Sequence, residues 1–219
     1  MTKPTKTTYY DNGQIETEKT YKDNNGKYKF WYKNGHKGAE GNYINGRMDG
    51  VYRMDGKWAD WYESGQIESE RNYKDGEKNG KWVDWYESGQ IKSETHYKDC
   101  VFEKTTTWYE NGQKEEEYTF LEKKTWYENG NLKKEENYKR VLWLNKHWTS
   151  IKHGEYTEWY ENGNLKLKIN YTNENVSDME YKTDKKVGWY ENGQKKFESN
   201  YTVGESWIHQ YWDKDGNLS

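Results

Sequence analysis

The chain has 219 residues, of which 31% are hydrophobic, 33% are charged and 18% are aromatic. Its net charge of -3 argues against a general nucleic-acid binder, and no apolar run approaches the roughly 20 residues of a membrane-spanning helix. A disordered chain would be depleted in aromatic residues and would carry a high net charge. We therefore expect an ordered protein whose folding depends on aromatic rings more than on aliphatic side chains.

A short phrase, WYENGQ or a close relative, recurs along the chain and divides it into nine units. The glycines of these phrases, called turn glycines below, are Gly13, Gly35, Gly65, Gly89, Gly112, Gly130, Gly163, Gly193 and Gly216. An Asn or Asp precedes most of them, and such dipeptides favour the two-residue type I′ turn of a β-hairpin. We therefore expect an N-terminal tail over residues 1–8 and a single array of hairpins over residues 9–219.

The flanks of each turn glycine repeat as strictly as the glycine itself. An aromatic residue stands four positions before it in every unit, Tyr in eight of the nine units stands three before it, and a further aromatic residue follows eight positions after it wherever the unit is long enough. Across a two-residue turn, the Tyr would lie opposite the Ile or Leu that often stands two positions after the glycine. That face would form the core. The other face would carry the Trp four before the glycine and the Glu five after it.

The tryptophans of this second face leave two interpretations open. The indoles could cover the sheet beneath long Lys and Glu side chains, or they could form an exposed platform for a ligand. For the second interpretation, the candidate partner-binding residues are Trp61, Trp85, Trp108, Trp126, Trp159 and Trp189. Four further glycines, nine positions before a turn glycine, are expected to mark the turns that join successive hairpins: Gly26, Gly56, Gly80 and Gly154.

Residues 60–100, 125–138 and 188–201 resemble the bacterial MORN variant repeat, which is found in YwqK-type antitoxin proteins. The resemblance covers nearly the whole chain. It implies an all-β fold, an elongated and twisted antiparallel sheet of about nine stacked β-hairpins, without a catalytic centre. It also implies a protein that binds and neutralises a partner.

An irregular insert at residues 139–154 interrupts the repeat and holds the most apolar cluster of the chain. It is expected to be either an enlarged hairpin packed over the sheet or a contact loop. The basic residues around it give a local positive charge that would suit an acidic surface. Its candidate partner-binding residues are Trp143, Trp148, Arg140 and Lys146.

The usual constellations of reactive side chains do not occur in the sequence, so we expect no enzyme, no catalytic residue, no metal site and no cofactor. The histidines are scattered without metal-ligand spacing. The single cysteine, Cys100, is expected to be a packed thiol between two units. It has no partner for an internal disulfide, which favours a reducing, cytoplasmic location.

Two functions fit these observations. The first is a non-enzymatic protein that binds and neutralises a protein partner, such as a toxin, a nuclease or a nucleic-acid-guided effector complex. The second is a secreted or envelope-associated scaffold that contacts host or surface molecules, which would require a signal segment removed upstream. Nucleic acid is not expected as the sole partner, and no membrane contact is expected. Because the last unit ends directly after its turn, the array could also self-associate end to end or through an open strand edge.

Overall fold

The computed structural model describes residues 5–22, 25–45, 52–142, 148–172, 183–200 and 208–219. All of its regular elements are β-strands, and the chain divides into two compact units, Met1–Gly112 and Gln113–Ser219. The strands of the first unit are β1 (Thr5–Tyr9), β2 (Ile15–Lys22), β3 (Asn25–Trp31), β4 (Lys37–Asn45), β5 (Tyr52–Trp61), β6 (Ile67–Lys74), β7 (Glu77–Lys78), β8 (Gly80–Trp85), β9 (Ile91–Lys98) and β10 (Val101–Trp108). Those of the second unit are β11 (Lys114–Thr119), β12 (Glu122–Trp126), β13 (Leu132–Leu142), β14 (Trp148–Trp159), β15 (Leu165–Tyr171), β16 (Thr183–Trp189), β17 (Lys195–Asn200) and β18 (Ile208–Tyr211).

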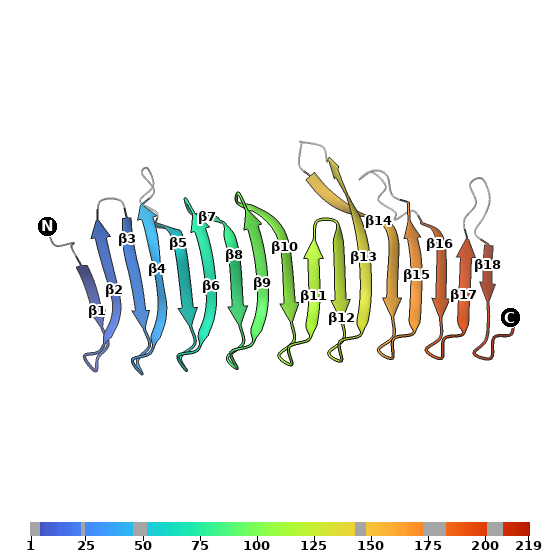
Figure 1. The fold of residues 1–219 in the computed structure, drawn as a ribbon, viewed down its shortest axis with the longest axis horizontal. Helices are drawn as coiled ribbons and strands as arrows, with labels where there is room; N and C mark the ends of the chain where they lie inside the picture. Colours follow the sequence, from blue (N-terminus) through green and yellow to red (C-terminus); the bar gives the residue numbers. More distant parts are fainter. Residues whose placement is uncertain (1–4, 23–24, 46–51, 143–147, 173–182, 201–207) are drawn as a thin grey trace. The chain divides into compact units, whose positions relative to one another are not determined.

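Within each unit, strands that follow one another in the sequence pair in antiparallel fashion and form a single-layer meander (Figure 1). The very short β7 and the strand that follows it, β8, both pair with β6, at successive positions along it. The expectation of an all-β, antiparallel fold built from hairpin strands is confirmed. The first strand begins at Thr5, so residues 5–8, which the sequence leaves in a tail, are part of the first hairpin.

The main turns differ from the expected two-residue type I′ turn. In the first hairpin, the Gly13 amide donates to the Tyr10 carbonyl at 2.9 Å, and the Tyr10 amide donates to the Gln14 carbonyl at 2.9 Å. Gly13 has a φ of 82°, whereas the preceding Asn12 is not among the residues with positive φ. This is the three-residue hairpin loop, a type I turn followed by a left-handed glycine, and the corresponding glycine bond recurs in all nine turns. The two-residue prediction is therefore wrong.

The extra loop residue changes which side chains share a face. The residue four before the turn glycine pairs with the residue two after it, as in Trp61 with Ile67 and Trp159 with Leu165. The predicted core position of these Ile and Leu side chains is wrong, because a shift of one residue in register moves a side chain to the opposite face. They lie beside the tryptophans, and Ile15 and Ile91 are 42% and 40% exposed.

The two faces can now be defined by repeat position. The tryptophan face carries the residues four before, two after and five after each turn glycine. The tyrosine face carries the residues three before and eight after it, together with an aromatic residue seven before it in several hairpins. The expected separation of Tyr from Trp is correct, and only the Ile and Leu side chains were placed on the wrong face.

Aromatic rings hold the tyrosine face together. In the first unit, the ring of Trp82 lies 5.0 Å from that of Tyr73 and 5.4 Å from that of Tyr97, and Tyr97 lies 6.2 Å from Phe102. Such pairs add to the burial of the rings themselves. Buried apolar residues are few in the described part of the chain: Ala39, Tyr43, Ala59, Val83, Tyr156 and Val187. Stacking between neighbouring strands therefore replaces a central core.

The four glycines nine positions before a turn glycine do not form the connecting turns, so that prediction is wrong. Gly26, Gly56 and Gly154 lie within strands, and Gly80 is the first residue of β8. Each of the four glycines pairs with the Tyr eight after the turn glycine, as Gly26 does with Tyr43. A Cβ atom on Gly26 would enter the Tyr43 ring. Glycine is required there because the ring lies directly over the backbone.

Two of the connecting turns are tight two-residue turns at the opposite end of the strands. Asp75 and Gly76 join β6 to β7, with φ of 54° and 87°, and Asp99 and Cys100 join β9 to β10, with φ of 49° and 64°. The type I′ geometry expected at the main turns therefore occurs at these connections. Cys100 is exposed, so the prediction of a packed thiol is wrong.

Replacing Cys100 with glycine is expected to stabilise the fold by about 0.5–1 kcal/mol. A left-handed backbone strains any residue that carries a Cβ atom by about 1–2 kcal/mol, and the greater flexibility of glycine in the unfolded chain offsets part of the gain. Urea denaturation measures the change. Cys100→Ser is the control, because it removes the thiol and keeps the Cβ atom. An equal gain in both variants would show that the thiol, and not the backbone, is responsible.

Within each unit, a row of tyrosine hydroxyls joins neighbouring hairpins. The Tyr three before a turn glycine donates to the backbone carbonyl of the tryptophan four before the next turn glycine, with oxygen–oxygen distances of 2.7–3.1 Å. The donors are Tyr10, Tyr32, Tyr62 and Tyr86 in the first unit and Tyr127, Tyr160 and Tyr190 in the second. Side-chain amides in the turns make further hydrogen bonds between hairpins: the Asn34 carboxamide donates to the Glu63 carbonyl at 2.8 Å.

Replacing Tyr62 with Phe is expected to lower the free energy of unfolding by about 1 kcal/mol. The ring stays in place, but the Trp85 carbonyl loses the donor that now lies 2.7 Å away. Tyr9→Phe is the control, because Tyr9 is 60% exposed and the same change there should cost less than about 0.5 kcal/mol. Equal losses in the two variants would contradict a structural role for the hydroxyl row.

The insert is an enlarged hairpin at the described positions. β13 and β14 continue past their neighbours and pair from Lys139 with Ile151 to Leu142 with Trp148 (Figure 1). At its base, the Ser150 hydroxyl donates to the Phe120 carbonyl at 2.9 Å. Trp143 and Lys146 lie outside the described residues. Trp148 is described only through its backbone, which begins β14.

Candidate functional site

The tryptophan row consists of the indoles four positions before the turn glycines. Its members are Trp31, Trp61, Trp85 and Trp108 in the first unit and Trp126, Trp159, Trp189 and Trp212 in the second. Each of these tryptophans is the last residue of a strand, except Trp212, which directly follows β18 and bridges to Leu218. All are half-buried. The tyrosine hydroxyls described above donate to the backbone carbonyls of seven of them and fix the chain segments that carry these indoles: Trp31, Trp61, Trp85, Trp108, Trp159, Trp189 and Trp212.

Besides its partner in the same hairpin, an indole of the row can have a neighbour from the preceding hairpin, as three of them do. Lys37 lies 5.0 Å from the centroid of the Trp61 ring, Lys114 lies 5.3 Å from that of Trp126, and Lys195 lies 5.0 Å from that of Trp212. These three lysines stand two positions after a turn glycine, where the other hairpins have Ile or Leu. The row therefore alternates between indoles and either aliphatic side chains or lysine cations.

Ion pairs form a second band on the tryptophan face. The Glu five after a turn glycine pairs with the Lys eight before it, as in Glu70 with Lys57 at 2.6 Å and Glu198 with Lys185 at 2.9 Å. One hairpin reverses the charges: Lys168 occupies the Glu position and pairs with Glu155 at 2.9 Å. An exchange that preserves the pairing indicates that these repeated carboxylates are structural.

Glu198 has the most perturbed carboxyl of this band. Lys195 at 2.7 Å and Lys185 at 2.9 Å donate to it and lower its pKa to about 2. Because this pKa is below that of the unfolded chain, its ionised form stabilises the fold above the unfolded pKa. The contribution is lost as the pH falls toward the folded pKa.

We expect Glu198→Gln to lower the free energy of unfolding at pH 7 by about 1 kcal/mol or less, as for other surface ion pairs. The difference from wild type should shrink below about pH 4.5 and vanish near pH 2. Urea denaturation at a series of pH values measures it. A difference that stays constant from pH 7 to pH 2 would contradict the role of the charge.

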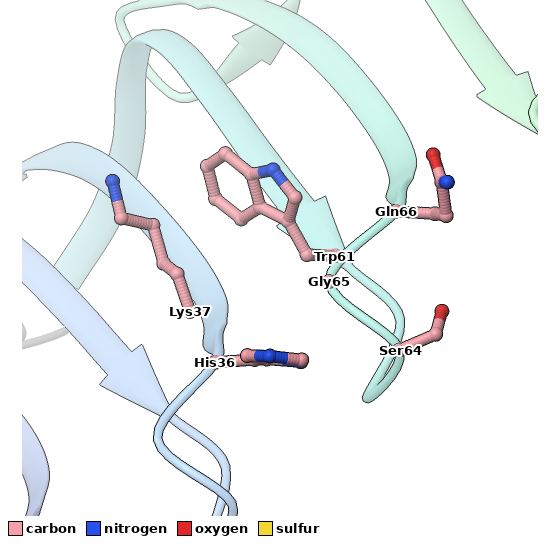
Figure 2. Close-up of a pocket in the computed structure, with 6 residues that line it drawn as sticks. All are labelled: His36, Lys37, Trp61, Ser64, Gly65 and Gln66. Atoms are coloured by element: carbon pink, nitrogen blue, oxygen red, sulfur yellow. The ribbon is translucent and has the colours of Figure 1, made fainter.

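A shallow pocket lies on the tryptophan face between the second and third turns. It has a volume of about 470 Å³ and is lined by His36, Lys37, Trp61, Ser64, Gly65 and Gln66 (Figure 2). Figure 2 shows the Lys37 side chain running alongside the Trp61 indole, with the His36 ring directed toward Ser64. The sequence reasoning selected Trp61 and missed His36 and Lys37. Comparison of the nine turns with one another could have found them, because no other turn has His or two cations at the same positions.

The structure does not bring the described part of the insert to the tryptophan row. Arg140 lies at the far end of β13, with its guanidinium carbon 4.9 Å from the centroid of the Phe120 ring. Leu132, at the beginning of the same strand, pairs with Trp126. The exposed Leu142 and Leu121 are also at the far end. Arg140, the insert candidate whose side chain is described, is therefore separated from the tryptophan row.

In the described part of the chain, no group of His, Cys, Asp and Glu side chains could hold a metal ion. None of the described segments forms a helix with the length and apolar character needed to cross a membrane.

Comparison with known families identifies the repeat. A model described as "MORN repeat variant" matches residues 5–23, 54–75, 78–99, 104–122, 121–140 and 152–173, which together are more than half of the chain. The matched segments contain β1, β6, β9, β15 and other paired strands of the meanders. No match to a curated protein is found.

Among solved structures, two similar chains are in crystal structures of TcdB2-TccC3 and TcdB2-TccC3-TEV. Their sequence identities are 10% and 11%, and their TM-scores are 0.24 and 0.23. Each alignment covers 98% of this chain and 13% of the other chain. TM-scores this low support no conclusion about fold or function.

Proposed function

The chain belongs to the MORN repeat variant family, and we propose that it is a repeat scaffold that binds a protein partner through its tryptophan face. The observation that carries the proposal is the tryptophan row itself: half-buried indoles that recur at one register position. Within each unit, the described residues form no second layer over this face (Figure 1). Tryptophan is among the residues that contribute most to protein–protein binding when a partner covers it.

The division of labour between the faces supports this choice. On the tyrosine face, rings contact one another and the hydroxyl row joins the hairpins. On the tryptophan face, exposed aliphatic side chains such as Ile15 and Ile91 lie in the same row as the indoles. Repeat proteins commonly use one extended surface to hold a partner. The tyrosine face therefore has the structural role, and the tryptophan face the binding role.

We further propose that binding neutralises the partner, in the manner of an antitoxin or inhibitor. The support for this finer statement is the resemblance of residues 60–100 to repeats of YwqK-type antitoxin proteins. The insert, with Trp143, Trp148, Arg140 and Lys146, is a second proposed contact surface. Its apolar and basic side chains would suit an acidic patch on the same partner.

Isolation of the partner and measurement of its affinity test the proposal. A partner is captured from the native host, and its dissociation constant is measured by calorimetry for wild type and for Trp85→Ala with Trp108→Ala. We expect affinity to fall at least tenfold, because interface tryptophans often contribute 2 kcal/mol or more each. Trp82→Phe is the matched control, because Trp82 lies on the tyrosine face.

An unchanged affinity in the double variant would overturn the assignment of binding to the tryptophan face. The neutralising role has its own measurement: co-expression of wild type should suppress the activity of the captured partner, whereas the double variant should not. Full partner activity in the presence of saturating wild-type protein would refute neutralisation while leaving binding intact.

A further inference from the structure

The second turn differs chemically from the other eight. Two positions before the turn glycine it has Lys33, where seven of the other turns have Asp or Glu. One position after the glycine it has His36, where all eight others have Gln or Asn, and two positions after it has Lys37. All nine turns lie within the described residues, and only this one carries basic side chains at all three positions. Since the repeat fold accepts the other residues at these positions, the basic set is not required for folding.

His36 is held in one orientation. Its Nδ1 lies 2.8 Å from the Glu63 carbonyl oxygen, so this nitrogen carries a proton and donates to the next turn. Nε2 is then the second polar atom of the ring. A Cβ atom on Gly65 would lie 3.2 Å from Nδ1, so a side chain there would crowd the His36 ring from the side of the pocket.

Lys37 and Trp61 form the adjacent wall. The Lys37 ammonium lies 5.0 Å from the Trp61 ring centroid and 2.6 Å from the Glu40 carboxylate. An ammonium group has three donors, so it can hold Glu40 and a second oxygen acceptor together. Ser64 and Gln66 line the opposite side, and in Figure 2 their side chains extend away from His36 and Trp61.

We propose that this pocket binds an oxyanion presented by a partner, either a carboxylate or a phosphate group. Lys37 supplies positive charge and N–H donors, Ser64 supplies a hydroxyl, and the indole of Trp61 supplies an apolar wall for the group that carries the anion. Lys33 is not among the lining residues, but it belongs to the same turn and adds to its positive charge. The pocket is large enough for one side chain. The inference builds on the proposed binding function, because it makes this turn the point on the tryptophan row that selects an acidic residue of the partner.

A small-ligand titration tests the site without the partner. Isotope-labelled protein is titrated with a capped glutamate peptide, a capped phosphoserine peptide and inorganic phosphate, and the spectrum follows the Trp61 indole N–H and the His36 and Gly65 amides. We expect saturable shifts confined to these residues. Saturation by the glutamate peptide identifies a carboxylate as the ligand, and saturation by the phosphoserine peptide or by phosphate identifies a phosphate.

The matched variant gives the second turn the residues of other turns: Lys33→Glu, His36→Gln and Lys37→Ile. It should fold normally, because these residues occupy the same positions elsewhere in the chain, and its affinity for the anion should fall at least tenfold. Lys195→Ile beside Trp212 is the control and should leave the affinity unchanged. Equal shifts at all nine turns, no saturable shift with any of the three probes, or full affinity in the triple variant would overturn the site.

The outcomes separate this inference from the proposed function. A partner that binds the triple variant as tightly as wild type would refute a role for the pocket and leave the tryptophan row as the interface. A loss of partner affinity in the Trp85 and Trp108 double variant, with none in the triple variant, would lead to the same conclusion. If no protein partner is captured, the proposed function fails, while the small-ligand titration still decides whether the pocket binds an oxyanion.

Discussion

Replacing Gly41 with alanine is expected to destabilise the folded protein by about 3 kcal/mol, at the upper end of the usual range for overpacking. Gly41 lies in β4 opposite Trp58 of β5, and a Cβ atom on it would enter the Trp58 ring. The ring cannot move freely, because it stacks on Tyr28 at 5.7 Å and its Nε1 donates to Asp60 at 3.1 Å. Urea denaturation followed by circular dichroism measures the loss.

A double-mutant cycle makes the Gly41 prediction specific. If the cost comes from the clash, a smaller ring at Trp58→Phe should recover part of it when combined with the alanine, which gives a coupling energy of about 1 kcal/mol or more. Gly163→Ala is a second control, because Gly163 has a φ of 89° and no atom within 4 Å of its would-be Cβ atom. That change should cost only the backbone strain of about 1–2 kcal/mol. Additive effects of the Gly41 and Trp58 changes would contradict the steric explanation.

Replacing Trp82 with alanine is expected to cost about 3 kcal/mol, near the lower end of the range for removing a large aromatic side chain. Trp82 makes several contacts on the tyrosine face. Its ring packs against those of Tyr73 and Tyr97, and its Nε1 donates to the Asn72 carbonyl at 2.8 Å. The cations of Arg71 and Lys78 lie 5.5 Å and 4.6 Å from the ring centroid. Removal leaves both tyrosines without their shared ring. Thermal or urea unfolding measures the loss.

The loss of stability in Trp85→Ala, compared with that in Trp82→Ala, distinguishes a structural tryptophan from a binding one. Trp82 and Trp85 lie in the same strand, β8, on opposite faces. Trp82→Ala should therefore reduce stability more than Trp85→Ala, and Trp85→Ala should reduce partner affinity more than Trp82→Phe. If Trp85→Ala destabilised the fold as strongly as Trp82→Ala, the tryptophan row would be structural, and the simpler interpretation of covered indoles would replace the binding platform.

The repeat unit and the order of the strands could be predicted from the sequence, because both depend on residues that are close together in the chain. Strands join through short connections at fixed offsets from Gly13, Gly35 and their equivalents, so pairing of neighbours follows from the chain itself. The alternation of Tyr and Trp at adjacent positions also settles that they occupy opposite faces, because successive side chains of a strand alternate.

Single-residue details of the turns could not be read in the same way. Asn-Gly fits both a two-residue type I′ turn and a three-residue loop that ends in a left-handed glycine. The structure takes the second form, in which Asn12 keeps a negative φ and its carboxamide oxygen accepts the Gln14 amide at 3.1 Å. That one extra loop residue moved Ile15, Ile67 and Leu165 from the expected core to the tryptophan face.

The candidate site was predictable in part. The tryptophan row followed from spacing, whereas the pocket at the second turn depends on how one hairpin stacks on the next. His36 and Trp61 are 25 positions apart, and they line one pocket because the second and third turns are adjacent. The local pattern around Trp61 contains no sign of His36. Whether Trp143 and Lys146 take part in binding stays a prediction, since they lie outside the described residues.

The sequence by itself determined an all-β chain of hairpin repeats whose folding relies on aromatic rings, because turn glycines and aromatic residues at fixed offsets act over a few residues. Only the tertiary structure decided which side chains share a face, which carboxylates are neutralised by lysines, and which turn forms a basic pocket. Those outcomes depend on register and on contacts between hairpins. A single residue in a loop changes the register without changing the repeat pattern, so the pattern alone leaves the faces and the site undetermined.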